Sequence, residues 1–152
     1  MKLLFVCLGN ICRSPTAEAI ATQLIKQQGL SWFCDSAGTN GFHDGEPADP
    51  RSIRHGKVRG YSLTSVSRQI TSEDFKNFDL LLAMDQNNVK TLEQICPDPQ
   101  LLGKIKLITD YATHDYNGVP DPYYGGAQGF ERVIDILEDS CAGLIAALRN
   151  QN

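Results

Sequence analysis

Cys7 and Arg13 are separated by five residues. This spacing of a cysteine and an arginine suits chemistry on a phosphate group. Five intervening residues can curl into a nest whose backbone N–H groups point at one centre, and such a centre fits a phosphate dianion. Arg13 can hold two phosphate oxygens in a bidentate grip, and a helix that begins behind it adds its positive end. The same positive field stabilises a thiolate, which is a competent nucleophile toward phosphorus. The pattern therefore predicts a phosphate-binding loop with Cys7 as its nucleophile.

The residues inside and around this segment bear on that interpretation. Gly9 and Asn10 tolerate the left-handed backbone that a tight cradle needs, and Ser14 can donate a hydrogen bond to the thiolate. The spacing alone is a weak signal, since a buried cysteine at a strand end and a surface arginine at a helix start would produce it as well. The apolar run before Cys7, and Pro15 at the start of an amphipathic helix, favour the phosphate loop.

The elements that must hold this loop alternate between strands and helices. Short apolar runs predict strands at 2–6, 32–36, 78–83 and 104–108. Helical spacing of apolar residues and capping signals predict helices at 15–28, 51–58, 85–95 and 130–148, with a brief helical turn at 71–74. This alternation predicts an α/β fold, a doubly wound three-layer sandwich of the flavodoxin-like kind. Its four-stranded parallel sheet has helices on both faces, and residues 1–152 form a single domain.

A long segment from Thr109 to Gly129 has no periodicity and is predicted to be a functional loop. It contains the sequence Asp-Pro-Tyr-Tyr, which begins at Asp121. Ligands of parallel sheets bind beyond the carboxyl ends of the strands, so Cys7 after the first strand and Asp121 after the fourth are expected on the same rim. Asp121 before Pro122 is either the former of a simple turn or a general acid, and the phosphate loop favours the acid.

Composition and charge argue against several classes of protein. A net charge of −4 and a pI of about 5.3 disfavour binding to nucleic acid or to an anionic membrane. The apolar run at 3–7 is too short for a signal sequence or a membrane span, so no membrane insertion is expected. Five cysteines, an odd number, indicate reduced thiols and a cytoplasmic location. Their spacing matches no zinc pattern, so no metal or cofactor is predicted, and the three histidines are expected in solvent.

Two motifs and three shorter segments of the chain match one known family. The motifs are Val6–Pro15, which Ala17-Glu18-Ala19 follows, and Asp121–Gly125, and the shorter segments are Asp35–Thr39, Ser67–Thr71 and Ala83–Asp85. With them the chain resembles, over essentially its whole length, the low-molecular-weight protein tyrosine phosphatase family. One position departs from the family pattern, because Ser65 stands where many members have a histidine.

The resemblance implies a role for each matching position. Cys7 corresponds to the nucleophile, Arg13 to the phosphate clamp and Asp121 to the general acid and base. The phosphate-binding loop comprises Leu8, Gly9, Asn10, Ile11, Cys12, Arg13 and Ser14, with Asn10, Ser14 and Ser36 as its supports. The aryl pocket is formed by Leu8, Ile11, Phe42, Tyr123 and Tyr124. Cys12 corresponds to a second thiol that forms a reversible disulfide with Cys7, which leads to the hypothesis that peroxide halts activity reversibly.

The function that follows is hydrolysis of phosphotyrosine and aryl phosphates through a phosphocysteine on Cys7, without metal or cofactor, releasing inorganic phosphate. The expected partners are phosphotyrosine-containing proteins, a tyrosine kinase among them. Two other functions stay open at this point. A thioredoxin-coupled arsenate reductase resembles this fold but typically uses a closely spaced cysteine pair in the second half, where Cys96 and Cys141 lie far apart. A non-catalytic phosphate-binding or redox-sensing protein would need no proton donor at Asp121.

Overall fold

The computed structural model describes residues 1–123 and 125–151, and its centre is a sheet of four strands in the order β2-β1-β3-β4. The strands are β1 (Lys2–Cys7), β2 (Phe33–Gly38), β3 (Leu80–Ala83) and β4 (Ile105–Leu107), and every neighbouring pair is parallel. All residues of β1 after Lys2 are buried, as expected for a central strand covered on both faces. The predicted parallel sheet is confirmed.

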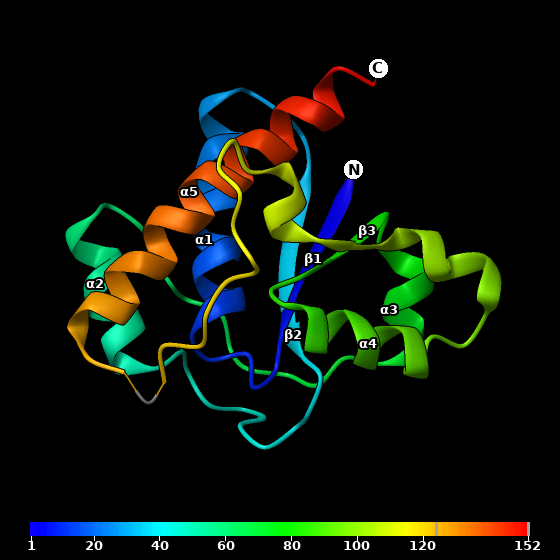
Figure 1. Cartoon of the computed structure of the whole chain (residues 1–152), viewed down its shortest axis with the longest axis horizontal. Helices are drawn as coiled ribbons and strands as arrows, with labels where there is room; N and C mark the ends of the chain where they lie inside the picture. The colour runs from blue at the N-terminus through cyan, green and yellow to red at the C-terminus, as the bar shows by residue number, and fades with distance from the viewer. Residues whose placement is uncertain (124, 152) are drawn as a thin grey trace.

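Helices cover both faces of the sheet (Figure 1). One face carries α1 (Arg13–Gln27) and α5 (Ala127–Arg149), and α2 (Pro50–Val58) packs against α5. The other face carries α3 (Ser72–Asn77) and α4 (Gln86–Ile95), together with the 3-10 helix η1 (Pro99–Lys104), while a second 3-10 helix, η2 (Ile108–Tyr111), packs against α5. The core accordingly divides into two main clusters, one on each face of the sheet. The doubly wound three-layer sandwich is thus confirmed.

Helix α1 begins at Arg13, so Pro15 lies in its first turn, as predicted; that turn makes no use of its N–H groups and therefore accepts a proline. The bounds of the predicted long loop, however, were wrong. The predicted loop at 109–129 is shorter at both ends, since η2 extends to Tyr111 and α5 already begins at Ala127. In contrast, the predicted apolar face of the last helix is confirmed, because all eight of its residues are buried.

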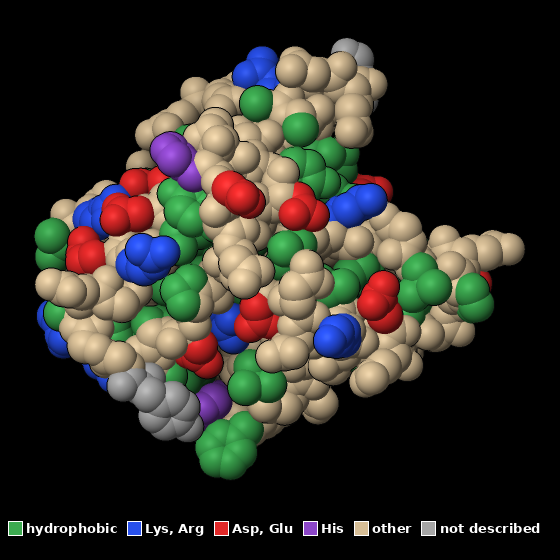
Figure 2. All heavy atoms as spheres, in the orientation of Figure 1, with side chains coloured by type: hydrophobic (Ala, Val, Ile, Leu, Met, Phe, Trp, Pro, Cys, Tyr) green, Lys and Arg blue, Asp and Glu red, His purple; other side chains and the backbone are tan. Residues whose placement is uncertain are grey.

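The carboxyl ends of the strands meet at one end of the molecule, and both chain termini lie near the opposite end (Figure 1). Cys7 pairs with Gly38 and Val6 with Ala83, so the loops after β1, β2 and β3 leave the sheet side by side. Acidic and basic side chains are interspersed over the face that Figure 2 shows, as the modest net charge suggests. No helix in the described part of the chain is long and apolar enough to cross a membrane.

Candidate active site

The loop between β1 and α1 curls around the sulfur of Cys7. Asn10 has φ 58°, the left-handed conformation expected there, and its backbone N–H donates to Cys7 Sγ at 3.3 Å. The side-chain amide of Asn10 donates to Ser14 Oγ at 2.7 Å, and Ser14 Oγ lies 3.0 Å from Cys7 Sγ. All three residues are buried. Two polar groups therefore converge on the sulfur.

The remaining backbone donors of this loop are available for a ligand. Among the described residues, the N–H groups of Leu8, Gly9, Ile11 and Cys12 donate to no protein acceptor. Buried or half-buried amides usually find a partner, and a phosphate in the cradle would supply several acceptor oxygens. The predicted nest is therefore consistent with the observed conformation.

The segments that follow β2 and precede α3 hold the loop from outside. Asn10 Oδ1 accepts from the backbone N–H of Arg68 at 3.1 Å, and the Ser67 hydroxyl donates to the carbonyl of Gly9 at 3.0 Å. Position 38 requires a glycine, because a Cβ there would lie 2.9 Å from the carbonyl oxygen of Leu8. The loop thus rests directly on the end of β2.

The structure does not bring Ser36, one of the three expected supports, to the loop. Its hydroxyl donates instead to Glu18 Oε1 on α1 at 2.6 Å. Burial raises the pKa of Glu18 above its ordinary value, against the effect of this hydrogen bond. Ser65, the position that departs from the family pattern, is half-buried and forms no hydrogen bond with the described residues.

Arg13 is 3% exposed and lies between two carboxylates. One of its terminal nitrogens donates to Asp85 Oδ2 at 2.6 Å and to the carbonyl of Val119 at 3.0 Å, while the other lies 3.7 Å from Asp121 Oδ2. Burial opposes its charge, but Cys7 and Asp85 outweigh burial and raise the pKa of Arg13. A cation of fixed orientation is therefore held beside the phosphate loop.

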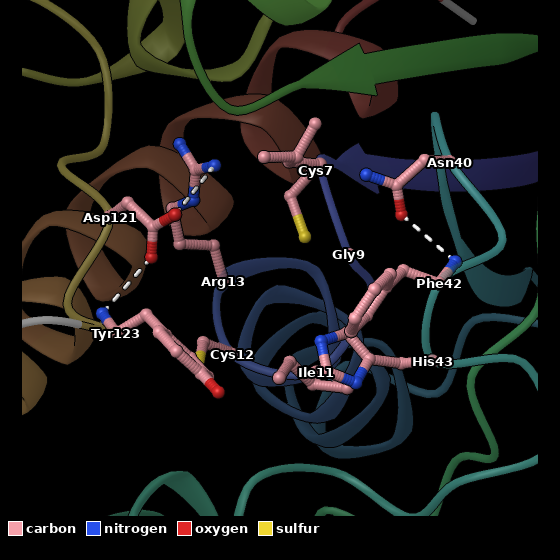
Figure 3. A pocket seen from close by; sticks show the side chains of 11 residues that line it. Cys7, Gly9, Ile11, Cys12, Arg13, Asn40, Phe42, His43, Asp121 and Tyr123 are labelled. Atoms are coloured by element: carbon pink, nitrogen blue, oxygen red, sulfur yellow. Dashed lines mark hydrogen bonds and ion pairs between the residues drawn. The ribbon is translucent and has the colours of Figure 1, made fainter.

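Asp121 lies at the rim, with 41% of its side chain exposed. Its Oδ1 accepts from the backbone N–H of Tyr123 at 3.0 Å, which turns the carboxylate toward Arg13 and Cys7 (Figure 3). The structure therefore places Cys7, Arg13 and Asp121 around one cavity of about 290 Å³, as the sequence predicted for the shared rim.

The walls of this cavity include most residues of the predicted aryl pocket. Leu8, Ile11, Phe42 and Tyr123 line it, and Phe42 is 83% exposed and so forms an outer wall. Tyr124, the fifth predicted wall residue, lies outside the described residues.

Burial raises the pKa of Cys12 to about 12, despite a hydrogen bond with Ser52. Its sulfur is therefore a protonated thiol at neutral pH beside the nucleophile. Both Cys7 and Cys12 line the cavity as free thiols. Within residues 1–123 and 125–151, no group of three or more His, Cys, Asp or Glu side chains could hold a metal ion.

Comparison with known proteins agrees with this geometry. A family model described as low molecular weight phosphotyrosine protein phosphatase matches residues 2–152. The chain belongs to this family. The human low molecular weight phosphotyrosine protein phosphatase is 42% identical over 147 residues, 95% of this chain and 93% of that protein. A Streptomyces coelicolor low molecular weight protein-tyrosine-phosphatase is 40% identical over 155 residues, 99% of this chain and 94% of the relative.

A solved structure of a protein tyrosine phosphatase from Entamoeba histolytica has a TM-score of 0.97 and 52% identity, covering 99% of this chain and 98% of that one. The predicted family, fold and enzyme class, a hydrolase of the protein tyrosine phosphatase type, are thereby confirmed.

Three residues of this phosphatase site were missed as site residues from the sequence. Asp85 contributed only the capping signal of the predicted helix at 85–95, although its place two residues after the end of β3 marks it as a rim residue. Asn40 and His43 also line the cavity. The prediction that all histidines lie in solvent was wrong for His43 and His55, each 18% exposed and bound to a glutamate, and correct for His114, which is 75% exposed.

Proposed function

We propose that this chain hydrolyses phosphotyrosine in proteins through a covalent phosphocysteine on Cys7. The observation that carries the proposal is the shared cavity, in which the Cys7 sulfur, the buried Arg13 and the carboxylate of Asp121 face one another. A nucleophile, a fixed cation and a proton donor are the three parts that such a reaction needs.

In the first step the Cys7 thiolate attacks phosphorus in line, and a new P–Sγ bond forms as the bond to the tyrosyl oxygen breaks. Asp121, in its protonated form, gives its proton to that oxygen, an effect typically worth about 10²–10⁴ in rate. The free amides of the loop and Arg13 stabilise the charge on the equatorial oxygens, which removes the need for a metal ion.

In the second step water hydrolyses the phosphocysteine. Asp121, now ionised, accepts a proton from the water, the new O–P bond forms, and the P–Sγ bond breaks with its electron pair on Cys7. Inorganic phosphate leaves and the thiolate is restored. Ser14 and the Asn10 amide, both in contact with the sulfur, stabilise that leaving thiolate.

The test is hydrolysis of an aryl phosphate and of a phosphotyrosine peptide in the presence of EDTA, with wild type, Cys7→Ser and Asp121→Ala. We expect metal-independent activity that disappears in Cys7→Ser and falls about 10²- to 10⁴-fold in Asp121→Ala. Activity that survives in Cys7→Ser, or that EDTA abolishes in wild type, would refute the proposal.

The proposal extends to partners and location. The pocket walls suit an aromatic phosphoester, so the partners are phosphotyrosine-containing proteins, and a tyrosine kinase is one candidate. The five cysteines, all free, support a cytoplasmic location, and residues 1–152 act as one domain. Cys12 beside Cys7 supports reversible protection by a disulfide, and full recovery of a Cys12→Ser variant after peroxide would count against that role.

The two other functions receive less support. An arsenate reductase relay would have to use Cys96 and Cys141, but Cys141 is buried in the core cluster on one face of the sheet and Cys96 packs on the cluster of the other face. A protein that only binds phosphate has no use for Asp121 at the rim.

A further inference from the structure

Asn40 is held beside the phosphate loop by main-chain hydrogen bonds. Its backbone N–H donates to the carbonyl of Leu8 at 3.1 Å, and the preceding Thr39 N–H donates to the carbonyl of Cys7 at 2.9 Å. These two bonds continue the pairing of β1 with β2 beyond the end of the sheet. The position of Asn40 relative to the nucleophile is therefore set by the backbone and not by a mobile side chain.

The side-chain amide of Asn40 has a fixed orientation. Its Oδ1 accepts from the backbone N–H of Phe42 at 3.1 Å, a local turn that Asn side chains commonly make. The Nδ2 group then points into the cavity, and Figure 3 shows Asn40 and Asp121 on opposite sides of the Cys7 side chain. Within residues 1–123 and 125–151 this Nδ2 donates to no protein acceptor. A donor without a protein partner in the described chain therefore faces the part of the cavity that the phosphoryl group would occupy in the proposed reaction.

We propose that Asn40 orients the water molecule that hydrolyses the phosphocysteine, an inference that rests on the function proposed above. The water oxygen attacks phosphorus on the side away from Sγ, with one lone pair directed at phosphorus. A second lone pair accepts a hydrogen bond from Asn40 Nδ2, and one proton passes to Asp121. The new O–P bond forms as the P–Sγ bond breaks, with its electron pair on Cys7. Side-chain amides orient the attacking water in other phosphoryl-transfer enzymes.

The two chemical steps depend on Asn40 to different extents. In the first step the ester oxygen needs no such guide, because its covalent bonds to phosphorus and to the ring already place it. A water molecule has no such tether and gains most from a fixed donor. Loss of the amide should therefore slow the decay of the phosphoenzyme and leave its formation nearly unchanged.

The test measures both steps by stopped-flow release of p-nitrophenol from p-nitrophenyl phosphate and by rapid-quench mass spectrometry of the phosphorylated protein. Asn40→Ser keeps an oxygen that can accept from the Phe42 N–H but removes the donor. Asn40→Ala removes both the acceptor oxygen and the Nδ2 donor. Comparison of the two variants therefore distinguishes loss of the turn from loss of the donor. Gln69→Ala is the matched control. Gln69 lies outside the cavity and supports the segment that carries Asn40, because its side-chain amide donates to the Thr39 carbonyl at 3.4 Å.

For Asn40→Ser we expect phosphoenzyme formation within about twofold of wild type and decay about tenfold slower, with Gln69→Ala like wild type in both steps. Decay at the wild-type rate, or equal slowing of both steps, would overturn the inference while leaving the proposed function intact. A wild-type protein that forms no phosphoenzyme would instead overturn the proposed function itself.

Discussion

Replacing Asp85 by Asn tests whether the orientation of Arg13 is set by the carboxylate behind it. Asp85 Oδ2 accepts from Arg13 at 2.6 Å, whereas its Oδ1 caps α4 by accepting from the N–H of Asn88 at 2.8 Å. Asn is as good a cap as Asp, so the substitution removes the ion pair and spares the helix. The released guanidinium would have Asp121, 3.7 Å away, as its nearest carboxylate.

The magnitude follows from the burial of the two partners. A hydrogen bond between charged groups contributes about 1.5–3 kcal/mol, and Arg13 is almost wholly buried. Asp85 is 31% exposed, so solvent weakens the pair and the lower half of this range applies. At about 1.4 kcal/mol for each factor of ten, kcat/KM should fall about 10- to 40-fold. Inhibition by inorganic phosphate should weaken in parallel, since the same guanidinium binds it.

The assay is steady-state hydrolysis of p-nitrophenyl phosphate with phosphate as a competitive inhibitor. Asp98→Asn is the matched control, because Asp98 caps η1 by accepting from the N–H of Gln100 at 2.9 Å. That variant makes the same chemical change in a cap outside the cavity and should behave like wild type. If Asp85→Asn retained kcat/KM within twofold of wild type, the carboxylate would not be what orients Arg13.

Three further predictions concern the loop, the two thiols and acid stability. Gly38→Ala should lower stability by about 1–3 kcal/mol in urea unfolding and reduce kcat, because its Cβ would lie 2.9 Å from two backbone oxygens. Gly103→Ala, with nothing within 4 Å, should do neither. Iodoacetamide at pH 7 should alkylate Cys7 before Cys12, because the Cys12 pKa of about 12 leaves almost no thiolate. Peptide mapping over time gives the order of alkylation, and modification of Cys12 first would contradict the prediction. Burial opposes ionisation of Asp139, but the hydrogen bonds that it accepts from Thr113 and His114 together outweigh burial and lower its pKa to about 2. This stabilisation is present above about pH 4 and is lost toward pH 2, so the stability difference between wild type and Asp139→Asn should shrink over that interval, and a constant difference would contradict it.

The fold was predictable because apolar runs and helical periodicity alternate so regularly. A strand such as β1, whose buried residues are continuous, has no solvent-facing side and therefore requires helices on both faces. The element ends were less predictable, because they depend on pairing partners. The strand predicted at 78–83 included Phe78 and Asp79. In the structure β3 begins only at Leu80, where pairing with Leu3 starts.

Cys7 and Arg13 could be found from their spacing together with the elements predicted around it, but their partners could not. Cys7, Arg13 and Ser14 lie within eight consecutive residues, so local sequence contains their relationship. The contact of Arg13 with Asp85 depends on β3 lying next to β1, and the strand order is a property of the folded chain. Knowledge of that order would have marked Asp85, because parallel neighbours end at the same rim.

Ser65 shows how a departure from a family pattern can be misleading when it is considered by itself. Taken alone, a serine in place of a histidine predicts a gap in the hydrogen bonds that hold the loop. The side-chain oxygen of Asn10, however, accepts a hydrogen bond from the backbone N–H of Arg68, and the Ser67 hydroxyl donates one to the carbonyl of Gly9. A backbone N–H is present whatever the side chain, so part of this support is independent of residue type. The loop therefore depends on where the segment at 67–68 lies, and the ion pairs of Arg68 with Asp35 on the edge strand β2 and with Asp74 on α3 fix that segment.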